Sequence, residues 1–147
     1  MGIVRTALDK ETVIVILGAT GDLARHLLIP ALLQLCRAQM LPKNVRIVLY
    51  ARRPHTLEHY LDEVRASLEA DGKRVTGWEQ FAPRFVAYVQ GGLDEKGIEQ
   101  LGAWVQANAV FYLALPPGVF AAAAELLAQM GFHDETRGYR RLVIEKP

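Results

Sequence analysis

A short glycine-containing segment, Gly18-Ala19-Thr20-Gly21-Asp22-Leu23-Ala24, holds the first residues of this chain whose types and spacing could do chemistry. Its pattern is G-x-x-G-x-x-A, in which the glycines permit a tight turn that a dinucleotide can approach closely. A plain tight turn would also have this composition. Because a β-branched run precedes the segment and a leucine-rich helical pattern follows it, we expect its amides to bind a pyrophosphate at a helix N-terminus.

Asp22 is an unusual residue for such a site, because its carboxylate would repel a phosphate. Aspartate is also a preferred N-cap, whose side chain accepts hydrogen bonds from the amides of the first helical turn. We therefore expect Asp22 to shape the turn first and to contact a cofactor only second.

Two arginines, Arg52 and Arg53, follow the second β-branched run. NAD-specific folds usually place an acidic residue here to hold the ribose 2′-hydroxyl, whereas an arginine accommodates a 2′-phosphate. The next acidic residue is Glu58, well beyond the strand end. Guanidinium groups also suit bidentate phosphate contact and stacking on adenine. The pair therefore favours NADP over NAD, with NAD still open, against the alternative of a solvated pair of charges.

These residues lie between elements that alternate along the whole chain. The expected strands are Thr12–Leu17, Val45–Ala51, Val86–Gln90, Ala109–Leu115 and Arg140–Glu145, and the expected helices are Leu23–Ala38, Leu57–Asp71, Glu95–Gln106 and Val119–Met130. Pro30 removes an amide donor within the first helix and predicts a kink there. The repeated strand–helix–strand order predicts an α/β fold, a Rossmann-type doubly wound parallel sheet of about five strands in a three-layer αβα arrangement.

Composition sets limits on the function. The chain has 147 residues, the size of one domain, and its 17 basic and 16 acidic residues leave a formal charge of +1, which predicts no general affinity for nucleic acid or anionic membrane. Its apolar stretches are too short to span a bilayer. One cysteine, Cys36, excludes an internal disulfide and a cysteine-based zinc site, and we expect no metal. The charged N-terminus is unlike a signal peptide, so we expect a cytoplasmic protein.

Five segments together resemble the N-terminal coenzyme domain of the glucose-6-phosphate dehydrogenase family: GATGDLA (18–24), LLIPALLQL (27–35), YARR (50–53), YLALPP (112–117) and EKP (145–147). The resemblance implies an enzyme of the pentose phosphate pathway that oxidises glucose 6-phosphate to 6-phosphogluconolactone and transfers a hydride to NADP. It also implies that full-length members form homo-oligomers.

The resemblance also implies roles for individual positions. Gly18, Ala19, Thr20, Gly21, Asp22 and Leu23 would surround the NADP phosphates, Arg52 would bind the 2′-phosphate, Arg53 would lie near the adenine, and Leu115 and Pro116 would line the nicotinamide side. Lys146 matches a family lysine that touches both the sugar phosphate and the coenzyme. Pro147 matches a proline associated with a cis peptide and with domain coupling. Phe120 departs from the family, whose members often have tyrosine there.

The chain lacks a residue that could act as the catalytic base. Oxidation of the sugar hydroxyl needs a base, and the family takes a histidine from a segment resembling R-I-D-H-Y-L-G-K, which does not occur here. The four histidines, His26, His55, His59 and His133, are interpreted as surface or packing residues. Residues 1–147 are therefore expected to be an NADP-binding domain without the family's C-terminal substrate domain, with little or no activity alone.

Two other function classes share part of this pattern. Short-chain and atypical reductases also open with a V-x-G-A-T-G-like turn, but they need a Tyr-x-x-x-Lys pair, and no lysine lies four places after any tyrosine of this chain. A non-catalytic NADP-sensing module is the second alternative. It would bind NADP and couple that binding to a partner protein without turnover.

Overall fold

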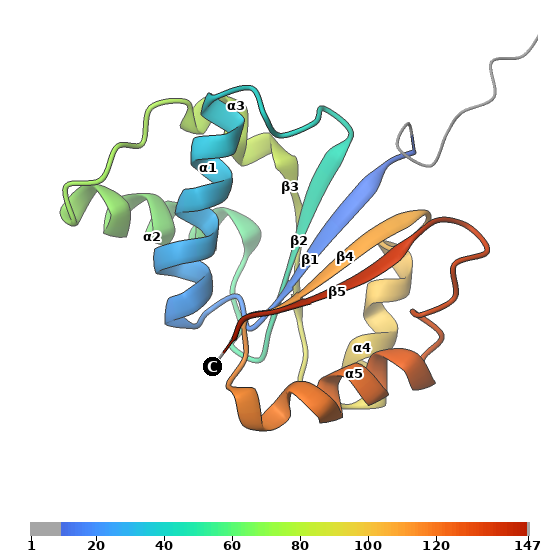
Figure 1. The fold of residues 1–147 in the computed structure, drawn as a ribbon. Helices are drawn as coiled ribbons and strands as arrows, with labels where there is room; N and C mark the ends of the chain where they lie inside the picture. Colours follow the sequence, from blue (N-terminus) through green and yellow to red (C-terminus); the bar gives the residue numbers. More distant parts are fainter. Residues whose placement is uncertain (1–9, 147) are drawn as a thin grey trace, which may run out of the picture.

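The computed structural model describes residues 10–146 and contains one parallel sheet (Figure 1). Its five strands are β1 (Thr12–Leu17), β2 (Val45–Ala51), β3 (Phe85–Gln90), β4 (Asn108–Leu113) and β5 (Arg140–Ile144). They are arranged in the order β3-β2-β1-β4-β5, and every neighbouring pair is parallel. The order reverses between β1 and β4, because the chain builds outward from β1 in one direction and then returns to build in the other. The predicted doubly wound α/β fold is confirmed.

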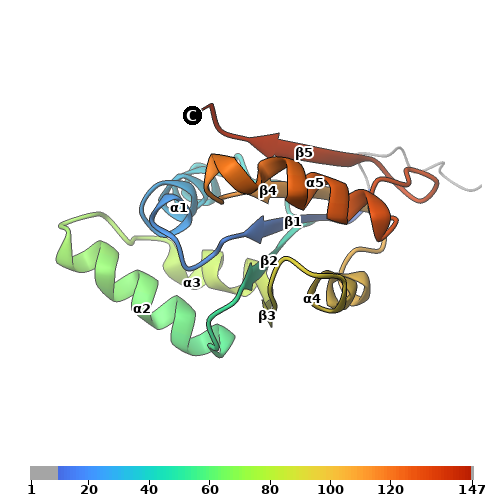
Figure 2. The same ribbon diagram turned by 90° about the horizontal axis from the view of Figure 1, so that it is seen from below.

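Helices cover both faces of this sheet. The long ones are α1 (Ile29–Arg37), α2 (Leu57–Ala70) and α5 (Phe120–Gln129); the short ones are α3 (Trp78–Phe81) and α4 (Glu95–Glu99), with a π-helical turn η2 (Leu23–Leu28) and 3-10 turns η3 (Ala82–Arg84), η4 (Gln100–Ala103) and η5 (Pro117–Val119). α1, α2 and α3 lie on one face and α4 and α5 on the other, which gives the predicted three layers (Figures 1 and 2).

The first helix differs from the single kinked helix expected over Leu23–Ala38. It is divided into the π-helical turn η2 and the α-helix α1, and Pro30 lies in the first turn of α1. The backbone stays helical through Leu28 and Ile29, so Pro30 removes a donor that carbonyls of the preceding turn would otherwise accept, and the hydrogen-bond pattern changes from π to α there. The discontinuity therefore falls where Pro30 predicts a kink.

The predicted ends of two further elements were wrong by a few residues. β4 stops at Leu113 rather than Leu115, because the chain leaves the sheet before Pro116. The helix expected over Glu95–Gln106 keeps α-helical geometry only to Glu99 and ends as the 3-10 turn η4, which contains Gly102, a weak helix former.

Burial of β1 on both faces organises the core. Val15 and Leu17 pack in the cluster beneath α4 and α5, whereas Ile16 packs in the cluster beneath α1 and α2, and all three side chains are 0% exposed. A central strand of a parallel sheet is expected to be apolar on both faces for this reason.

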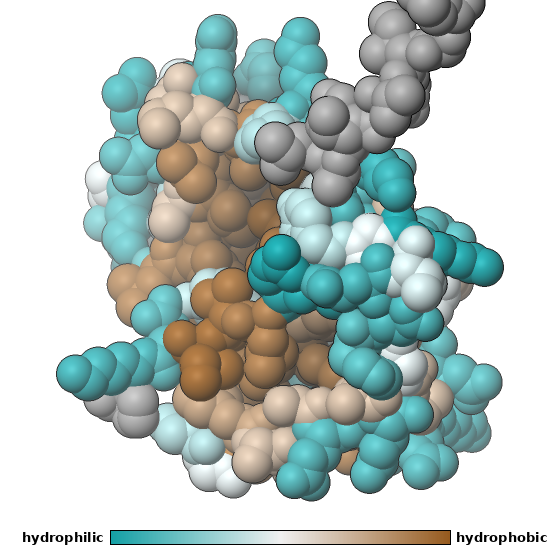
Figure 3. Space-filling model, turned by 45° about the vertical axis from the view of Figure 1, so that its right-hand side comes forward, coloured by the Kyte–Doolittle hydropathy of each residue, from teal (hydrophilic) through white to brown (hydrophobic). Residues whose placement is uncertain are grey.

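Apolar side chains also reach the surface at the open edge of the sheet. Leu142 and Ile144 of the edge strand β5 are 47% and 54% exposed. Figure 3 shows apolar side chains gathered over a broad, hollowed area of the molecule. None of the described helices is both long enough and apolar enough to cross a membrane.

The position of Ile16 in the core predicts a large loss of stability on truncation. Ile16→Ala should lower the free energy of unfolding by about 2–5 kcal/mol, because it removes buried methylene groups and leaves a cavity. Leu27→Ala is the matched control: Leu27 is 64% exposed, so its truncation should change the free energy by less than about 0.5 kcal/mol. Urea denaturation followed by circular dichroism measures both, and equal losses in the two variants would contradict this description of the core.

Candidate functional site

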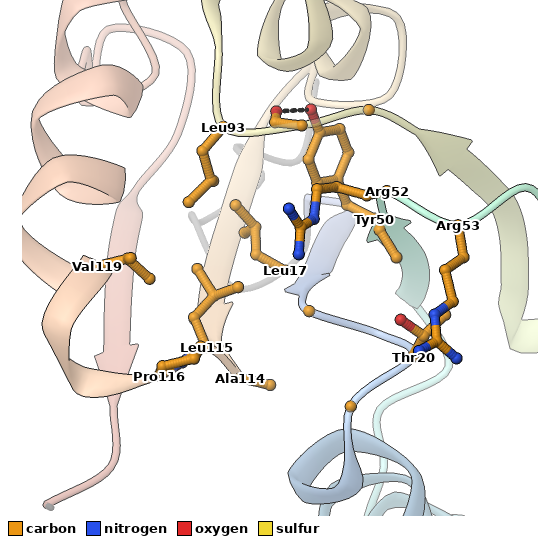
Figure 4. Close-up of a pocket in the computed structure, with 15 residues that line it drawn as sticks. Leu17, Thr20, Tyr50, Arg52, Arg53, Leu93, Ala114, Leu115, Pro116 and Val119 are labelled. Atoms are coloured by element: carbon orange, nitrogen blue, oxygen red, sulfur yellow. Dashed lines mark hydrogen bonds between the residues drawn. The ribbon is translucent and has the colours of Figure 1, made fainter.

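A cleft of about 420 Å³ opens at the carboxyl ends of β1, β2, β3 and β4. It spans the point between β1 and β4 where the strand order reverses. Ligands of doubly wound sheets bind at such a point, because the loops that follow the two strands diverge there and leave a crevice. The glycine turn after β1 and the end of β2 border this cleft on one side, and Leu115, Pro116 and Val119, which follow β4, border it on the other (Figure 4).

The glycine turn is held by a very close backbone contact. Gly18 has a φ of +89°, and a Cβ atom placed on it would lie 2.1 Å from the carbonyl oxygen of Ala114. Its amide donates to the carbonyl oxygen of Tyr50 at 2.9 Å, and the amide of Gly21 donates to the carbonyl of Gly18 at 3.0 Å. Only glycine fits position 18, because any side chain would be both conformationally strained and in collision with the end of β4.

The amides of Thr20 and Asp22 in this turn are available to a ligand. The amides of Gly18 and Ala19 both donate to the Tyr50 carbonyl, and that of Gly21 donates within the turn. Those of Thr20 and Asp22 have no backbone acceptor among residues 10–146. Both precede η2 and α1, so an anion bound to them would also lie at the N-terminal end of the helical segment, where the helix dipole favours negative charge.

The predicted capping role of Asp22 was wrong. Its backbone is already helical, with φ −64° and ψ −39°, and its side chain makes no capping hydrogen bond. A capping side chain requires an extended backbone at that position to fold back over the first turn. The Asp22 carboxylate instead lies in solvent, with one oxygen 3.7 Å from Nε2 of His26.

Most of the other predicted cofactor residues lie in the cleft. Those that line it are Gly18, Thr20, Gly21, Arg52, Arg53, Leu115 and Pro116. Ala19 is buried beneath the turn, where its carbonyl accepts a hydrogen bond from the hydroxyl of Tyr60, and Leu23 packs its side chain against the core. These two residues can therefore position the turn, but their side chains do not line the cleft.

The two arginines project from a backbone that β3 anchors. The hydroxyl of Tyr88 donates to the Arg53 carbonyl at 2.6 Å, and the side-chain amide of Gln90 donates to the Arg52 carbonyl at 3.3 Å. Both arginine side chains are exposed, and within the described part of the chain neither forms an ion pair. Arg52 extends over the cleft, while Arg53 extends on the side of the glycine turn (Figure 4). Two unpaired guanidinium groups at a cleft mouth suit an anionic ligand.

The loop after β3 is a wall of the cleft that the sequence reasoning missed. The buried side chain of Tyr50 donates from its hydroxyl to the carbonyl of Gly92, and a Cβ atom on Gly91 would lie 2.3 Å from that hydroxyl oxygen. Leu93 continues the loop along the cleft. The Gly91-Gly92 pair directly after a predicted strand was a usable signal, since it also lies at a carboxyl end of the sheet.

Lys146 is exposed and follows β5, but it does not line this cleft. The adjacent Glu145 carboxylate accepts a hydrogen bond from the hydroxyl of Tyr112. Burial and this interaction with Glu145 raise the pKa of Tyr112 to about 12. The predicted contact of Lys146 with substrate and coenzyme stays a prediction, and the expectation for Pro147 lies outside the described residues.

None of the four histidines lines the cleft. His133 is exposed in the loop before β5, and His26 lies near the carboxylates of Asp22 and Asp71. Phe120 packs against the core beneath α5, so its ring has a packing role where a tyrosine hydroxyl would be expected in the family.

The comparison with protein-family models gives a match over residues 15–147, to the model described as "Glucose-6-phosphate dehydrogenase, NAD binding domain". The chain belongs to the glucose-6-phosphate dehydrogenase family. This membership confirms the resemblance inferred from the motifs and sets the short-chain reductase alternative aside.

Relatives of known name agree with this membership. The glucose-6-phosphate 1-dehydrogenase of Aspergillus niger is 34% identical over 149 residues, which cover 95% of this chain and 29% of the relative. The enzyme of that name from Saccharomyces cerevisiae is 35% identical, covering 95% of this chain and 30% of the relative. The chain therefore spans about a third of the length of these glucose-6-phosphate dehydrogenases.

Solved structures of the family share the fold. A glucose-6-phosphate 1-dehydrogenase from Mycobacterium avium superposes with a TM-score of 0.82 at 30% identity, covering 93% of this chain and 30% of that one. A glucose-6-phosphate dehydrogenase in complex with its substrate glucose-6-phosphate superposes with a TM-score of 0.71, again at 30% identity, covering 94% of this chain and 31% of that one.

The contact of Gly18 with Ala114 predicts that Gly18→Ala destabilises the protein by at least about 2 kcal/mol, because the new methyl group meets backbone atoms and requires a strained φ. Gly102→Ala is the matched control, since a Cβ atom on Gly102 meets nothing within 4 Å. Thermal and urea unfolding measure both variants. A Gly18→Ala protein as stable as Gly102→Ala would show that the turn does not adopt the described conformation.

Tyr50 gives the cleft a pH signature. Burial, together with the charge of Asp94, raises the pKa of Tyr50 from 10.0 to about 12. The neutral hydroxyl therefore contributes stability that is fully present below about pH 10 and is lost as the pH rises toward 12. Wild-type stability should fall more steeply over this interval than that of Tyr50→Phe, which has no proton to lose. Urea unfolding at pH 9, 10 and 11 measures the difference, and parallel curves would contradict it.

Proposed function

We propose that residues 1–147 form the NADP-binding domain of a glucose-6-phosphate dehydrogenase. The observation that carries this proposal is the cleft at the strand-order reversal, which is bordered by a glycine turn with free amide donors and by two unpaired arginines. NADP differs from NAD by a 2′-phosphate, and no acidic residue lines the cleft, within the described residues, to hold a 2′-hydroxyl in its place.

The donors of the cleft fit the parts of this coenzyme. The amides of Thr20 and Asp22 would bind the pyrophosphate, since they lack backbone acceptors among the described residues. Arg52 would bind the 2′-phosphate and Arg53 would lie near the adenine. Leu115 and Pro116 supply an apolar wall for the nicotinamide side. When bound, NADP supplies a hydride acceptor, and the residues of this chain bind and orient it.

The cleft holds no group suited to act as a base near neutral pH. Its titratable lining residues are Tyr50, Arg52 and Arg53. Tyr50 has a pKa of about 12, and its proton is directed to the Gly92 carbonyl. We therefore infer that this chain alone binds NADP without turnover. In the complete enzyme a histidine from outside this chain would take the hydroxyl proton as glucose 6-phosphate is oxidised to 6-phosphogluconolactone, with Lys146 contacting substrate and coenzyme.

We propose a role in the pentose phosphate pathway, in the cytoplasm, within a homo-oligomeric full-length enzyme. One supporting relative is named "Glucose-6-phosphate 1-dehydrogenase 6, cytoplasmic" in Arabidopsis thaliana, and it is 31% identical over 151 residues, covering 91% of this chain and 29% of the relative.

Titration of the purified chain with NADP and NAD by calorimetry tests the proposal. Arg52→Ala should weaken NADP binding by about 10- to 100-fold, equal to about 1.4–2.7 kcal/mol, because a charge-assisted phosphate contact is lost. NAD binding should change by less than about threefold, since NAD lacks that phosphate. Arg65→Ala is the matched control, because Arg65 lies on α2 and pairs with Glu69 and Glu79.

Two results would overturn the proposal. An Arg52→Ala protein with unchanged NADP affinity would remove the 2′-phosphate site, and a wild-type chain that binds neither nucleotide would remove the coenzyme function. Reduction of NADP by the wild-type chain with glucose 6-phosphate would contradict the inference that the base lies elsewhere.

A further inference from the structure

Two histidines and a glutamate meet near the start of α2, and none of them lines the coenzyme cleft. His55 lies in the loop after the arginines, and His59 and Glu63 lie one helical turn apart on α2. One ligand atom from each of the three lies within 4.8 Å of those of the other two, and Nε2 of His59 is 3.1 Å from Oε1 of Glu63. The sequence interpretation of His55 and His59 as surface or packing residues does not account for this convergence.

The start of α2 fixes the relative position of the two rings. Thr56 caps the helix, and its side chain accepts a hydrogen bond from the amide of His59 at 3.1 Å. This cap sets the direction in which the chain enters the helix and brings the ring of His55 over that of His59. The ring centroids are 5.6 Å apart and the planes are inclined by only 22°.

The ring of His55 carries a buried nitrogen without a partner. Its Nδ1 is shielded from solvent and makes no hydrogen bond to any described residue. The ring is held by edge contacts with Tyr60 and Tyr88, whose centroids lie 6.0 and 5.6 Å away. A buried polar atom that lacks a hydrogen bond destabilises the fold, so a packing role alone would favour an apolar residue here.

The carboxylate of Glu63 is oriented from its other side. Its Oε2 lies 3.9 Å from Nη2 of Arg25, whereas its Oε1 faces His59. Outer partners of this kind hold a ligating carboxylate in place at metal sites. Arg25 can therefore fix the carboxylate while leaving one oxygen directed at the two imidazoles.

We propose that His55, His59 and Glu63 bind a divalent transition-metal ion, of which Zn²⁺ is the best match. Two imidazoles and a carboxylate form an open three-ligand Zn²⁺ set, with a fourth position for water. Imidazole also favours Zn²⁺, Cu²⁺ and Ni²⁺ over the oxygen-preferring Mg²⁺ and Ca²⁺. Zn²⁺ ligand bonds of about 2.0–2.1 Å place ligand atoms roughly 3.3 Å apart in a tetrahedron. The His59–Glu63 pair already has a similar spacing, and these two side chains, 64% and 39% exposed, have room to turn toward the fixed ring of His55.

Two tyrosines connect the proposed metal site to backbone segments that form the coenzyme cleft. Tyr60, which touches the ring of His55, donates from its hydroxyl to the Ala19 carbonyl in the glycine turn. Tyr88, which touches the same ring, donates to the Arg53 carbonyl. None of the three ligands lines the cleft, so metal and nucleotide binding can be measured separately.

Titration of the tag-free chain with Zn²⁺ at pH 7.5, in competition with a chromogenic chelator, tests the proposal. The wild type should bind one equivalent. His59→Ala and Glu63→Gln, both changes of partly or fully exposed side chains, should each weaken binding by at least about tenfold. His55→Ala should do the same, and because this change can disturb the tyrosine contacts, its fold is checked by circular dichroism. His133→Ala and Cys36→Ser are the controls and should bind as the wild type does.

Three outcomes would overturn the proposal: no saturable binding to the wild type, unchanged affinity in both His59→Ala and Glu63→Gln, or loss of binding in His133→Ala or Cys36→Ser. A rise in the thermal unfolding midpoint on addition of Zn²⁺ should accompany binding in the wild type and be absent in His59→Ala. NADP affinity of His59→Ala, measured without metal, should equal that of the wild type, which separates this site from the coenzyme function.

Discussion

The contact between Gly18 and the Ala114 carbonyl is the constraint on which the site depends. β1 and β4 are neighbours in the sheet, yet the chain leaves them in different directions, toward α1 and toward α5. The turn after β1 must therefore pass directly over the end of β4, and only a residue without a side chain can do so at a φ of +89°. This passage leaves the amides of Thr20 and Asp22 without a backbone acceptor among the described residues, and it places Thr20 in the wall of the cleft. The same divergence of chain paths opens the crevice in which a ligand can lie.

The residues that line this cleft can bind and orient a ligand, but none of them is suited to act as an acid or a base near neutral pH. Its charges are two arginines, and its one ionisable hydroxyl, that of Tyr50, is committed to the Gly92 carbonyl, which closes the wall after β3. The arginines depend on β3 as well, because Tyr88 and Gln90 hold the backbone from which they project. The coenzyme selectivity proposed for Arg52 therefore depends on two adjacent strands, β2 and β3, rather than on one residue.

The features that the sequence predicted correctly are those determined by local pattern. A β-branched run followed by a glycine turn identified β1 and its loop, and the arginines were placed correctly because strand ends meet at one edge of a parallel sheet. The sequence misled or was silent where the role of a residue depends on its backbone angles or on contacts with residues far away in the sequence. Asp22 has the composition of an N-cap but a helical backbone. Tyr50 reaches Gly92 across 42 positions of sequence. The cluster of His55, His59 and Glu63 was partly visible as spacing on a helix, but the ring of His55 joins it only through the turn that Thr56 caps.

The most direct test of the central claim is a map of NADP binding on the backbone. In ¹⁵N-correlated NMR spectra of the chain, addition of NADP should shift the amide signals of Thr20, Gly21 and Asp22 most strongly, together with those of Arg52 and Gly92. The amide signals of Gln34 and Arg74 should not shift, because these residues line a separate hollow. Shifts concentrated at that second hollow, with the glycine turn unchanged, would contradict the account.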